Sequence, residues 1–156
     1  MTTLAASMLR DRTEADDVVE DALLRIHDGA AAFRGERGLR TWVLRITANL
    51  CRDRLRRRKF VAGSMDDVDF APGAGLGFNP VADWDGAMDQ RTLAAALERA
   101  VAALPADQRE AVVLRHRLGL THQEMSETLG VPEGTVKSRL SRALSALREA
   151  LEGVDR

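Results

Sequence analysis

The first sustained apolar pattern of the chain predicts an amphipathic helix from about Glu14 to Asp28. Thr13 followed by Asp16 resembles a capping arrangement at its start, and Gly29 is a natural end. The apolar positions recur at helical spacing, at Val18, Val19, Ala22, Leu23 and Ile26. The opposite face is acidic, with Asp17, Glu20, Asp21 and Asp28, and on the pattern alone it is typical of a solvated helix face.

A longer helix is predicted from about Leu39 to Arg58, after a loop that begins at Arg34. Its apolar residues cover an arc of about 100° and are Leu39, Trp42, Val43, Ile46 and Leu50. A separate arc of about 80° carries Thr41, Arg45, Asn49, Arg52 and Arg56. Arg, Asn and Thr bond to phosphates and base edges, so the second arc is a candidate nucleic-acid interface. Trp42 lies between the arcs, and either packs in the core or forms a wall beside an unstacked base.

The last third of the chain begins with two predicted helices. An Ala/Leu-rich pattern over residues 93–104 ends at Pro105. Asp107 can cap the next helix, which runs to about Arg117 and is closed by Gly119.

Two further helices follow with only a short turn between them. Thr121 and Glu124 form a capping-box pattern that opens a short helix through Leu129. Gly130 permits a left-handed turn, and a last helix begins near Glu133. Two short helices joined by a three- to four-residue turn containing Gly are typical of a helix-turn-helix.

The last helix has two distinct faces. An apolar stripe is predicted to be buried and comprises Val136, Leu140, Ala143, Leu144, Leu147 and Leu151. The opposite face carries Lys137, Ser138, Ser141, Arg142 and Ser145. Small hydroxyl side chains let a helix enter the major groove, where Lys and Arg reach base edges or phosphates, so this face predicts DNA binding.

Composition supports an all-α fold of two small helical domains joined by a flexible linker. Aromatic residues make up only 4% of the 156 residues and Tyr is absent, which disfavours sheets. Residues 61–90 contain five Gly, two Pro and a cluster of Asp, which is linker composition. We therefore expect domains at 1–60 and 91–156, the second containing the helix-turn-helix.

Charge and cysteine content narrow the functional classes. Residues 34–59 hold 10 basic and 2 acidic residues, which suits a polyanionic partner, although a solvated helix face remains the alternative. The single cysteine, Cys51, excludes an internal disulfide and a Cys-based zinc cluster, and we expect no metal and no cofactor. Neither a signal peptide nor a membrane-spanning run is visible, so we expect a cytoplasmic protein without membrane insertion.

Three segments of the chain resemble the extracytoplasmic-function group of bacterial RNA polymerase sigma factors. They are ADDVVEDALLRIH, FRGERGLRTWVLRITANLCRDRLRRRK and LPADQREAVVLRHRLGLTHQEMSETLGVPEGTVKSRLSRALSALRE. The resemblance covers about residues 13–60 and 93–151, in the family's order. The chain departs from the family at Glu20, where Gln is usual, and at Leu23 and Leu39, where Phe is common.

The resemblance implies that the first domain binds core RNA polymerase and opens and reads the minus-ten promoter element. It places on the polymerase-facing helix Asp17, Glu20, Asp21 and Arg25. The loop from Arg34 to Leu39 would hold an extruded base. The minus-ten single strand would be bound by Arg34, Gly35, Arg37, Trp42, Arg45, Asn49, Arg52 and Arg56.

The resemblance also implies that the second domain reads the minus-thirty-five element as duplex DNA. Its reading residues would be Lys137, Ser138, Ser141 and Arg142, and phosphates would be bound by Arg115, Thr121 and Arg139. The implied partners are core RNA polymerase, promoter DNA and an anti-sigma factor.

Two other classes of function remain open at this point. One is a sigma-like decoy or adaptor that binds polymerase or a regulator without opening promoters. The other is an enzyme built on Cys51 and the histidines His27, His116 and His122. Neighbouring arginines could lower the pKa of Cys51, but no histidine stands at a motif spacing from it, so we expect no enzymatic activity.

Overall fold

The computed structural model describes residues 1–35, 38–62 and 90–152. These residues form helices and the turns between them, and no strand occurs among them. The expected all-α class is therefore confirmed. Of the expected linker, residues 63–89 lie outside the described residues.

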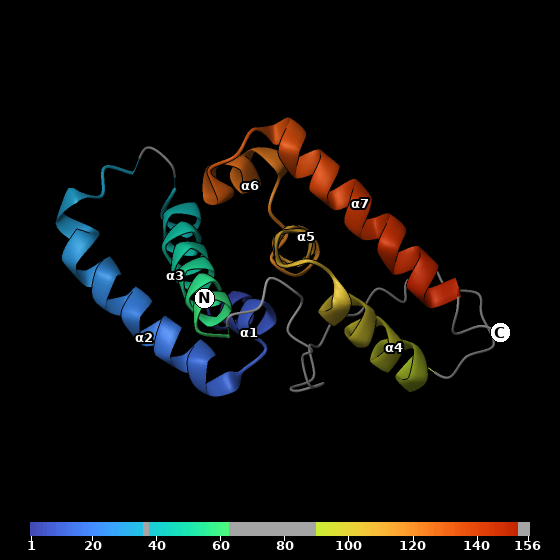
Figure 1. Ribbon diagram of the computed structural model, residues 1–156. Helices are drawn as coiled ribbons and strands as arrows, with labels where there is room; N and C mark the ends of the chain where they lie inside the picture. The colour runs from blue at the N-terminus through green and yellow to red at the C-terminus, as the bar shows by residue number, and fades with distance from the viewer. Residues whose placement is uncertain (36–37, 63–89, 153–156) are drawn as a thin grey trace.

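Three helices build the N-terminal domain, namely α1 (Thr2–Leu9), α2 (Arg12–Gly29) and α3 (Leu39–Ala62), with a short 3-10 turn, η1 (Ala30–Ala32), after α2. Figure 1 shows α2 and α3 side by side, and α1 packs against both. Helix α1 is almost wholly buried on its inner face, where Leu4, Ala5, Met8 and Leu9 are at most 1% exposed. It ends at Arg10, whose φ of 56° closes the helix in the left-handed region.

The expected cap of α2 at Thr13 is wrong. The helix begins earlier, and the carboxylate of Asp11 accepts a hydrogen bond of 3.0 Å from the backbone N–H of Glu14. Asp11 has an extended backbone, so its side chain can turn back over the first turn, whereas Thr13 already lies within the helix.

Gly29 ends α2, but it has a φ of −85° and leads into η1 instead of a left-handed turn. Glycine is needed here for space. A Cβ at position 29 would lie 3.1 Å from the Trp42 ring, so the small residue allows Trp42 to approach the backbone of α2.

The buried face of α3 differs from the predicted apolar arc. Leu39 is 59% exposed, and Trp42, Val43 and Ile46 are only half-buried. The buried residues are Thr41, Leu44, Thr47, Ala48, Leu50 and Cys51. The reason is that α3 packs against α1 and α2 and also against α6 of the other domain, so its burial does not follow one stripe.

The C-terminal domain contains α4 (Gln90–Ala103), α5 (Ala106–Val112), a π-helical turn η3 (Val113–Arg117), α6 (His122–Leu129) and α7 (Glu133–Glu152). Helices α6 and α7 form the predicted helix-turn-helix. Thr121 and Glu124 make both hydrogen bonds of the capping box, and Gly130 has a left-handed φ of 68°. The expectation that Asp107 caps α5 is wrong. The N-cap of α5 is Pro105, and Asp107 already lies in the first turn of the helix.

The apolar stripe of α7 is confirmed at four positions, since Val136, Leu140, Ala143 and Leu147 are buried. Leu144 is 46% exposed and Leu151 is half-buried, so the predicted stripe was too wide. Helices α4, α5 and α6 cover one narrow face of α7, and Leu144 lies beside that face.

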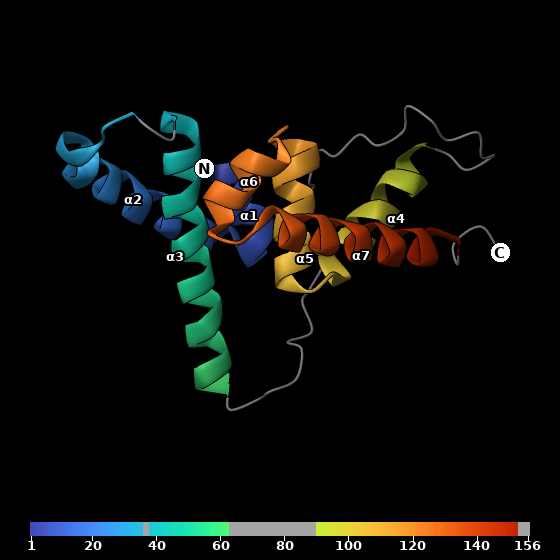
Figure 2. The ribbon, with the colours of Figure 1, turned by 90° about the horizontal axis from the view of Figure 1, so that it is seen from above.

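The two domains pack against each other and share one continuous hydrophobic core. Figure 2 shows α6 beside α3 and α5 near α1. The helices of each pair, α3 with α6 and α1 with α5, are in contact. Arg109 on α5 is 3% exposed and joins the halves by donating hydrogen bonds to the carbonyls of Ala102 (2.7 Å), Leu104 (3.3 Å) and Met8 (3.4 Å). Burial, with a smaller contribution from Arg10, lowers the pKa of Arg109 to about 10, so it stays charged at neutral pH.

Candidate nucleic-acid interface

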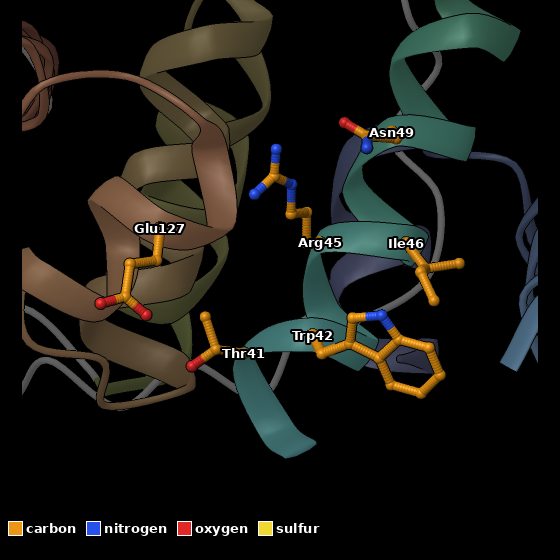
Figure 3. Close-up of a pocket in the computed structure, with 6 residues that line it drawn as sticks. All are labelled: Thr41, Trp42, Arg45, Ile46, Asn49 and Glu127. Carbon is orange, nitrogen blue, oxygen red and sulfur yellow. The ribbon is translucent and has the colours of Figure 1, made fainter. Parts of the chain in front are cut away.

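The polar arc of α3 faces the C-terminal domain along a shared boundary. A pocket at this boundary is lined by Thr41, Trp42, Arg45, Ile46, Asn49 and Glu127. Figure 3 shows Arg45 extending from α3 toward the neighbouring helix, with Trp42 and Ile46 directed to another side of α3. Arg45 lies near the turn of the helix-turn-helix, since its Nη2 atom would be 3.9 Å from a Cβ at Gly130.

Arg52 does not extend into open space but bonds to the C-terminal domain. Its Nη2 and Nε atoms donate to the two carboxylate oxygens of Glu110, at 3.0 and 3.2 Å. Its Nη1 atom donates to the side-chain oxygen of Asn49 at 2.9 Å. All three guanidinium nitrogens are thus engaged, and two of the residues predicted to bind a strand are held together.

Glu110 is 1% exposed, so its carboxylate is taken out of water at the domain boundary. Burial raises the pKa of Glu110, while Arg52 opposes that rise by its charge and its hydrogen bonds. Removing one partner of a buried ion pair is strongly destabilising, so we expect the loss of Arg52 to weaken the packing of the two domains.

Trp42 is packed on one side and lines the pocket on another. It is half-buried, and its ring lies 4.9 Å from the ring of Phe33 with a tilt of 32°. It also lines the pocket beside Arg45. The stacked pair, held against Gly29, fixes the position of Trp42 at the edge of the polar arc.

The loop before α3 presents exposed residues at its described positions. Arg34 and Gly35 are exposed, and the positive φ values of Gly35 (76°) and Gly38 (68°) need glycine. Arg37 lies outside the described residues. Arg56, further along α3, is also exposed and pairs with Asp53 of the same helix.

The outer face of α7 is open to solvent. Lys137, Ser141 and Arg142 are exposed, and Ser138 is half-buried. Arg142 donates from Nη2 to the Ser138 hydroxyl at 3.3 Å, so the two side chains lie one helical turn apart and in contact. The structure thus brings the four predicted reading residues onto one accessible face.

The residues expected to bind phosphates beside α7 are tied to the domain itself. Arg139 is 3.4 Å from the Asp107 carboxylate, Arg115 donates to the carbonyl of Leu120 at 2.8 Å, and Thr121 belongs to the capping box. These contacts orient the side chains of Arg115 and Arg139 at the base of the helix-turn-helix.

Asp17, Glu20 and Asp21 on the acidic face of α2 are exposed, and so is Arg25 on the same helix. Arg54 of α3 lies 4.0 Å from the Asp17 carboxylate and 3.8 Å from that of Asp21. Exposed pairs at such distances are weak, so both carboxylates stay available to a partner.

Comparisons with known proteins assign the two halves of the chain to one family. The family model for sigma-70 region 2 matches residues 1–61, and the model for sigma-70 region 4 matches residues 94–147. The extracytoplasmic-function (ECF) RNA polymerase sigma factor SigM of Mycobacterium tuberculosis is 38% identical over 149 residues, which cover 95% of this chain and 69% of SigM. The chain belongs to the ECF sigma factors. It is therefore a sigma factor for promoter-specific initiation of transcription.

Other relatives and a solved structure extend this family assignment. SigW of Bacillus subtilis is 31% identical to the sigma factor over 153 residues, covering 95% of this chain and 81% of SigW. The sigma factor RpoE of Bartonella quintana, solved in complex with the anti-sigma factor NepR, superposes with a TM-score of 0.72. That match has 27% identity and covers 99% of this chain and 91% of RpoE. The family is one of sigma factors and not of enzymes.

The sigma factor also contains interface residues that sequence reasoning missed. Glu110 and Glu127 lie on helices predicted for the C-terminal domain, and nothing in their spacing relates them to α3. The only signal was that Glu110 directly precedes the apolar run Ala111–Leu114, because a charged residue beside such a run is buried only with a partner.

The thiol of Cys51 in the sigma factor is not an activated nucleophile. The expectation that nearby arginines could lower its pKa is wrong, because burial and the charge of Glu110 raise the pKa to about 12. No group of His, Cys, Asp and Glu residues suited to a metal ion occurs in the described part of the chain. Among the described helices, none is both long and apolar enough to cross a membrane.

We expect Cys51 to resist alkylation in the folded sigma factor. Its side chain is fully buried, and a pKa near 12 leaves almost no thiolate at neutral pH. Iodoacetamide at pH 7 should modify guanidinium-denatured protein and leave the native protein unmodified over the same time. Equal rates in the two states would show that Cys51 is accessible.

Proposed function

We propose that the sigma factor uses two separate faces on promoter DNA. The polar arc of α3, with Arg45, Asn49 and Arg52, binds the separated non-template strand of the minus-ten element, beside Trp42 and the loop at Arg34 and Gly35. The outer face of α7 reads the minus-thirty-five element as duplex. The observation that carries the proposal is the exposed row of Lys137, Ser141 and Arg142 on the second helix of a capped helix-turn-helix.

Run-off transcription tests this proposal directly. The sigma factor is added to core RNA polymerase on genomic fragments, and promoter-specific RNA of defined length is expected. Core polymerase without the sigma factor is the control. Polymerase binding without any specific transcript would instead favour the sigma-like decoy or adaptor, which no observation on this protein supports.

The acidic face of α2 is proposed as the polymerase-docking surface. Like charges repel free DNA from Asp17 and Asp21, whereas a positively charged protein surface would attract them. The Asp17→Lys/Asp21→Lys variant should bind core polymerase about tenfold more weakly or worse. Its duplex binding through α7 should be unchanged, since α7 is distant in sequence and carries no part of this face.

The measurement is a titration of labelled sigma factor with core polymerase. Glu149→Lys, on the exposed side of α7, is a matched control with the same sign of charge change. Polymerase affinity that is equal for wild type and the double variant would remove α2 from the interface.

The remaining partner is inferred from the family. RpoE of Bartonella quintana was solved with the anti-sigma factor NepR, and the sigma factor CnrH was solved with the cytosolic domain of CnrY. We infer that the present sigma factor is also held by an anti-sigma factor, and that it acts in the cytoplasm, where RNA polymerase works. No cofactor or catalytic group enters this function.

A further inference from the structure

Gly134, the second residue of α7, is a glycine that the fold does not explain. In the part of the chain that the structure describes, Gly29 makes room for the Trp42 ring, and four other glycines have positive φ values that favour glycine, namely Gly35, Gly38, Gly119 and Gly130. Gly134 has no positive φ and is exposed. A Cβ added there would meet no heavy atom within 4 Å beyond its chain neighbours and the backbone of its own helix.

The first turn of a helix gains nothing from a glycine of this kind. Glycine loses more conformational freedom on folding than alanine does, and alanine is the better helix former. Alanine at position 134 would also fit without a clash. Because nothing within the chain uses the missing side chain, the reason for it lies outside the chain, and glycine is the residue that lets a backbone come close to a ligand.

Gly134 begins a narrow strip of small residues on the exposed side of α7. At 100° per residue the strip spans an arc of about 60° and comprises Gly134, Ser138, Ser141 and Ser145. Lys137 lies on one side of the strip and Arg142 on the other, and both are exposed. The hydroxyl of Ser138 donates to the carbonyl of Thr135 at 2.9 Å, which holds it close to the helix. The strip therefore runs through the middle of the face proposed to read the upstream element.

We propose that Gly134 sets the depth at which α7 enters the major groove of the upstream element. In a helix-turn-helix the N-terminal residues of the second helix contact base edges, so the first turn of α7 lies deepest. Without a side chain at position 134, the backbone of this turn approaches the bases closely enough for Lys137 and Ser138, one turn later, to reach them. This inference rests on the proposed role of α7 in reading duplex DNA.

The proposal separates the effect of Gly134→Ala on stability from its effect on DNA binding. The midpoint of thermal unfolding should equal or exceed that of the wild type, because alanine favours the helix and has space. Affinity for the upstream element should fall about tenfold, since a methyl group inserted into a closely packed contact forces the two surfaces apart. No charge is lost, so the slope of log affinity against log salt should not change.

The test uses the full-length sigma factor assembled with core RNA polymerase. Fluorescence anisotropy measures its affinity for a promoter fragment found by run-off transcription and for the same fragment with a scrambled upstream element. Circular dichroism of the free proteins gives the unfolding midpoint. Gly134→Ala and Gly134→Leu add increasing bulk at the start of α7, and Ala95→Leu adds bulk at an exposed position of α4 as a control.

We expect Gly134→Ala to lower affinity for the promoter fragment about tenfold and Gly134→Leu to lower it further. Affinity for the scrambled fragment should change by no more than about twofold in both variants, because contacts to phosphates remain. Ala95→Leu should match the wild type on both fragments.

Three results would overturn the proposal. The first is equal affinity of the wild type and Gly134→Ala for the promoter fragment. The second is a lowered unfolding midpoint in Gly134→Ala, because the fold itself would then require the glycine. The third is an equal loss on both fragments, because the methyl group would then obstruct the DNA backbone and not the base edges.

A failure of the proposed function gives a different result. If the wild-type holoenzyme binds the promoter fragment and the scrambled fragment equally, α7 does not read the upstream element, and the role of Gly134 in groove depth fails with it. If the wild type prefers the promoter fragment and Gly134→Ala prefers it to the same extent with the same affinity, the reading role of α7 stands and only the role of Gly134 fails.

Discussion

Replacing Arg45 and Arg52 together with Ala should reduce the rate of open-complex formation about 100-fold, since two charged hydrogen-bonding groups of about 1.5 kcal/mol or more each are lost. Binding to the closed duplex promoter should change much less, because we propose that the duplex contacts are made by α7. The physical reason is that both guanidiniums lie on the polar arc of α3, where Arg45 also lines the pocket with Trp42.

The measurement is permanganate footprinting of the promoter over time, with a gel-shift assay for duplex binding. Arg12→Ala, on the exposed first turn of α2, is a control that removes a positive charge elsewhere in the domain. A template with a pre-melted bubble should rescue the double variant in part. Absence of rescue would mean that the arginines contribute to closed-complex affinity and not to melting.

The second large effect is expected on α7, where replacing either of two arginines with Ala should change DNA binding in a different way. Arg142 is exposed and lies against Ser138, so its guanidinium can reach O6 and N7 of one guanine. Arg142→Ala should therefore cost roughly 1–3 kcal/mol of base discrimination at one or two positions. Arg139 is 3.4 Å from Asp107 at the side of the helix, where a phosphate is the better target. Arg139→Ala should weaken binding to all sequences alike.

Binding isotherms on single-base variants of the upstream element, at two salt concentrations, separate these effects. Loss of one phosphate contact in Arg139→Ala should reduce the slope of log affinity against log salt by about one. Lys137→Ala provides a comparison on the same exposed face. If Arg142→Ala also loses affinity uniformly, Arg142 is a phosphate anchor and does not read bases.

The sequence by itself determined the features that local chemistry controls. The capping box at Thr121 and Glu124, the left-handed turn at Gly130 and the face of Lys137, Ser141 and Arg142 are as the pattern predicted. Each depends on contacts within a few residues along the chain, and such contacts are specified by residue type and spacing alone. The all-α class follows in the same way from helical periodicity and the scarcity of aromatic and β-branched runs.

Only the tertiary structure decided which faces meet. The same period of α3 fits several buried arcs, and its burial was settled by α6 as well as by α1 and α2. Helix α1, too short for a strong pattern, proved to be central to the core, and the raised pKa of Cys51 follows from that burial and from Glu110. The Arg52–Glu110 pair joins residues 58 positions apart, and a contact of that kind is fixed by how the domains pack, which no local pattern encodes.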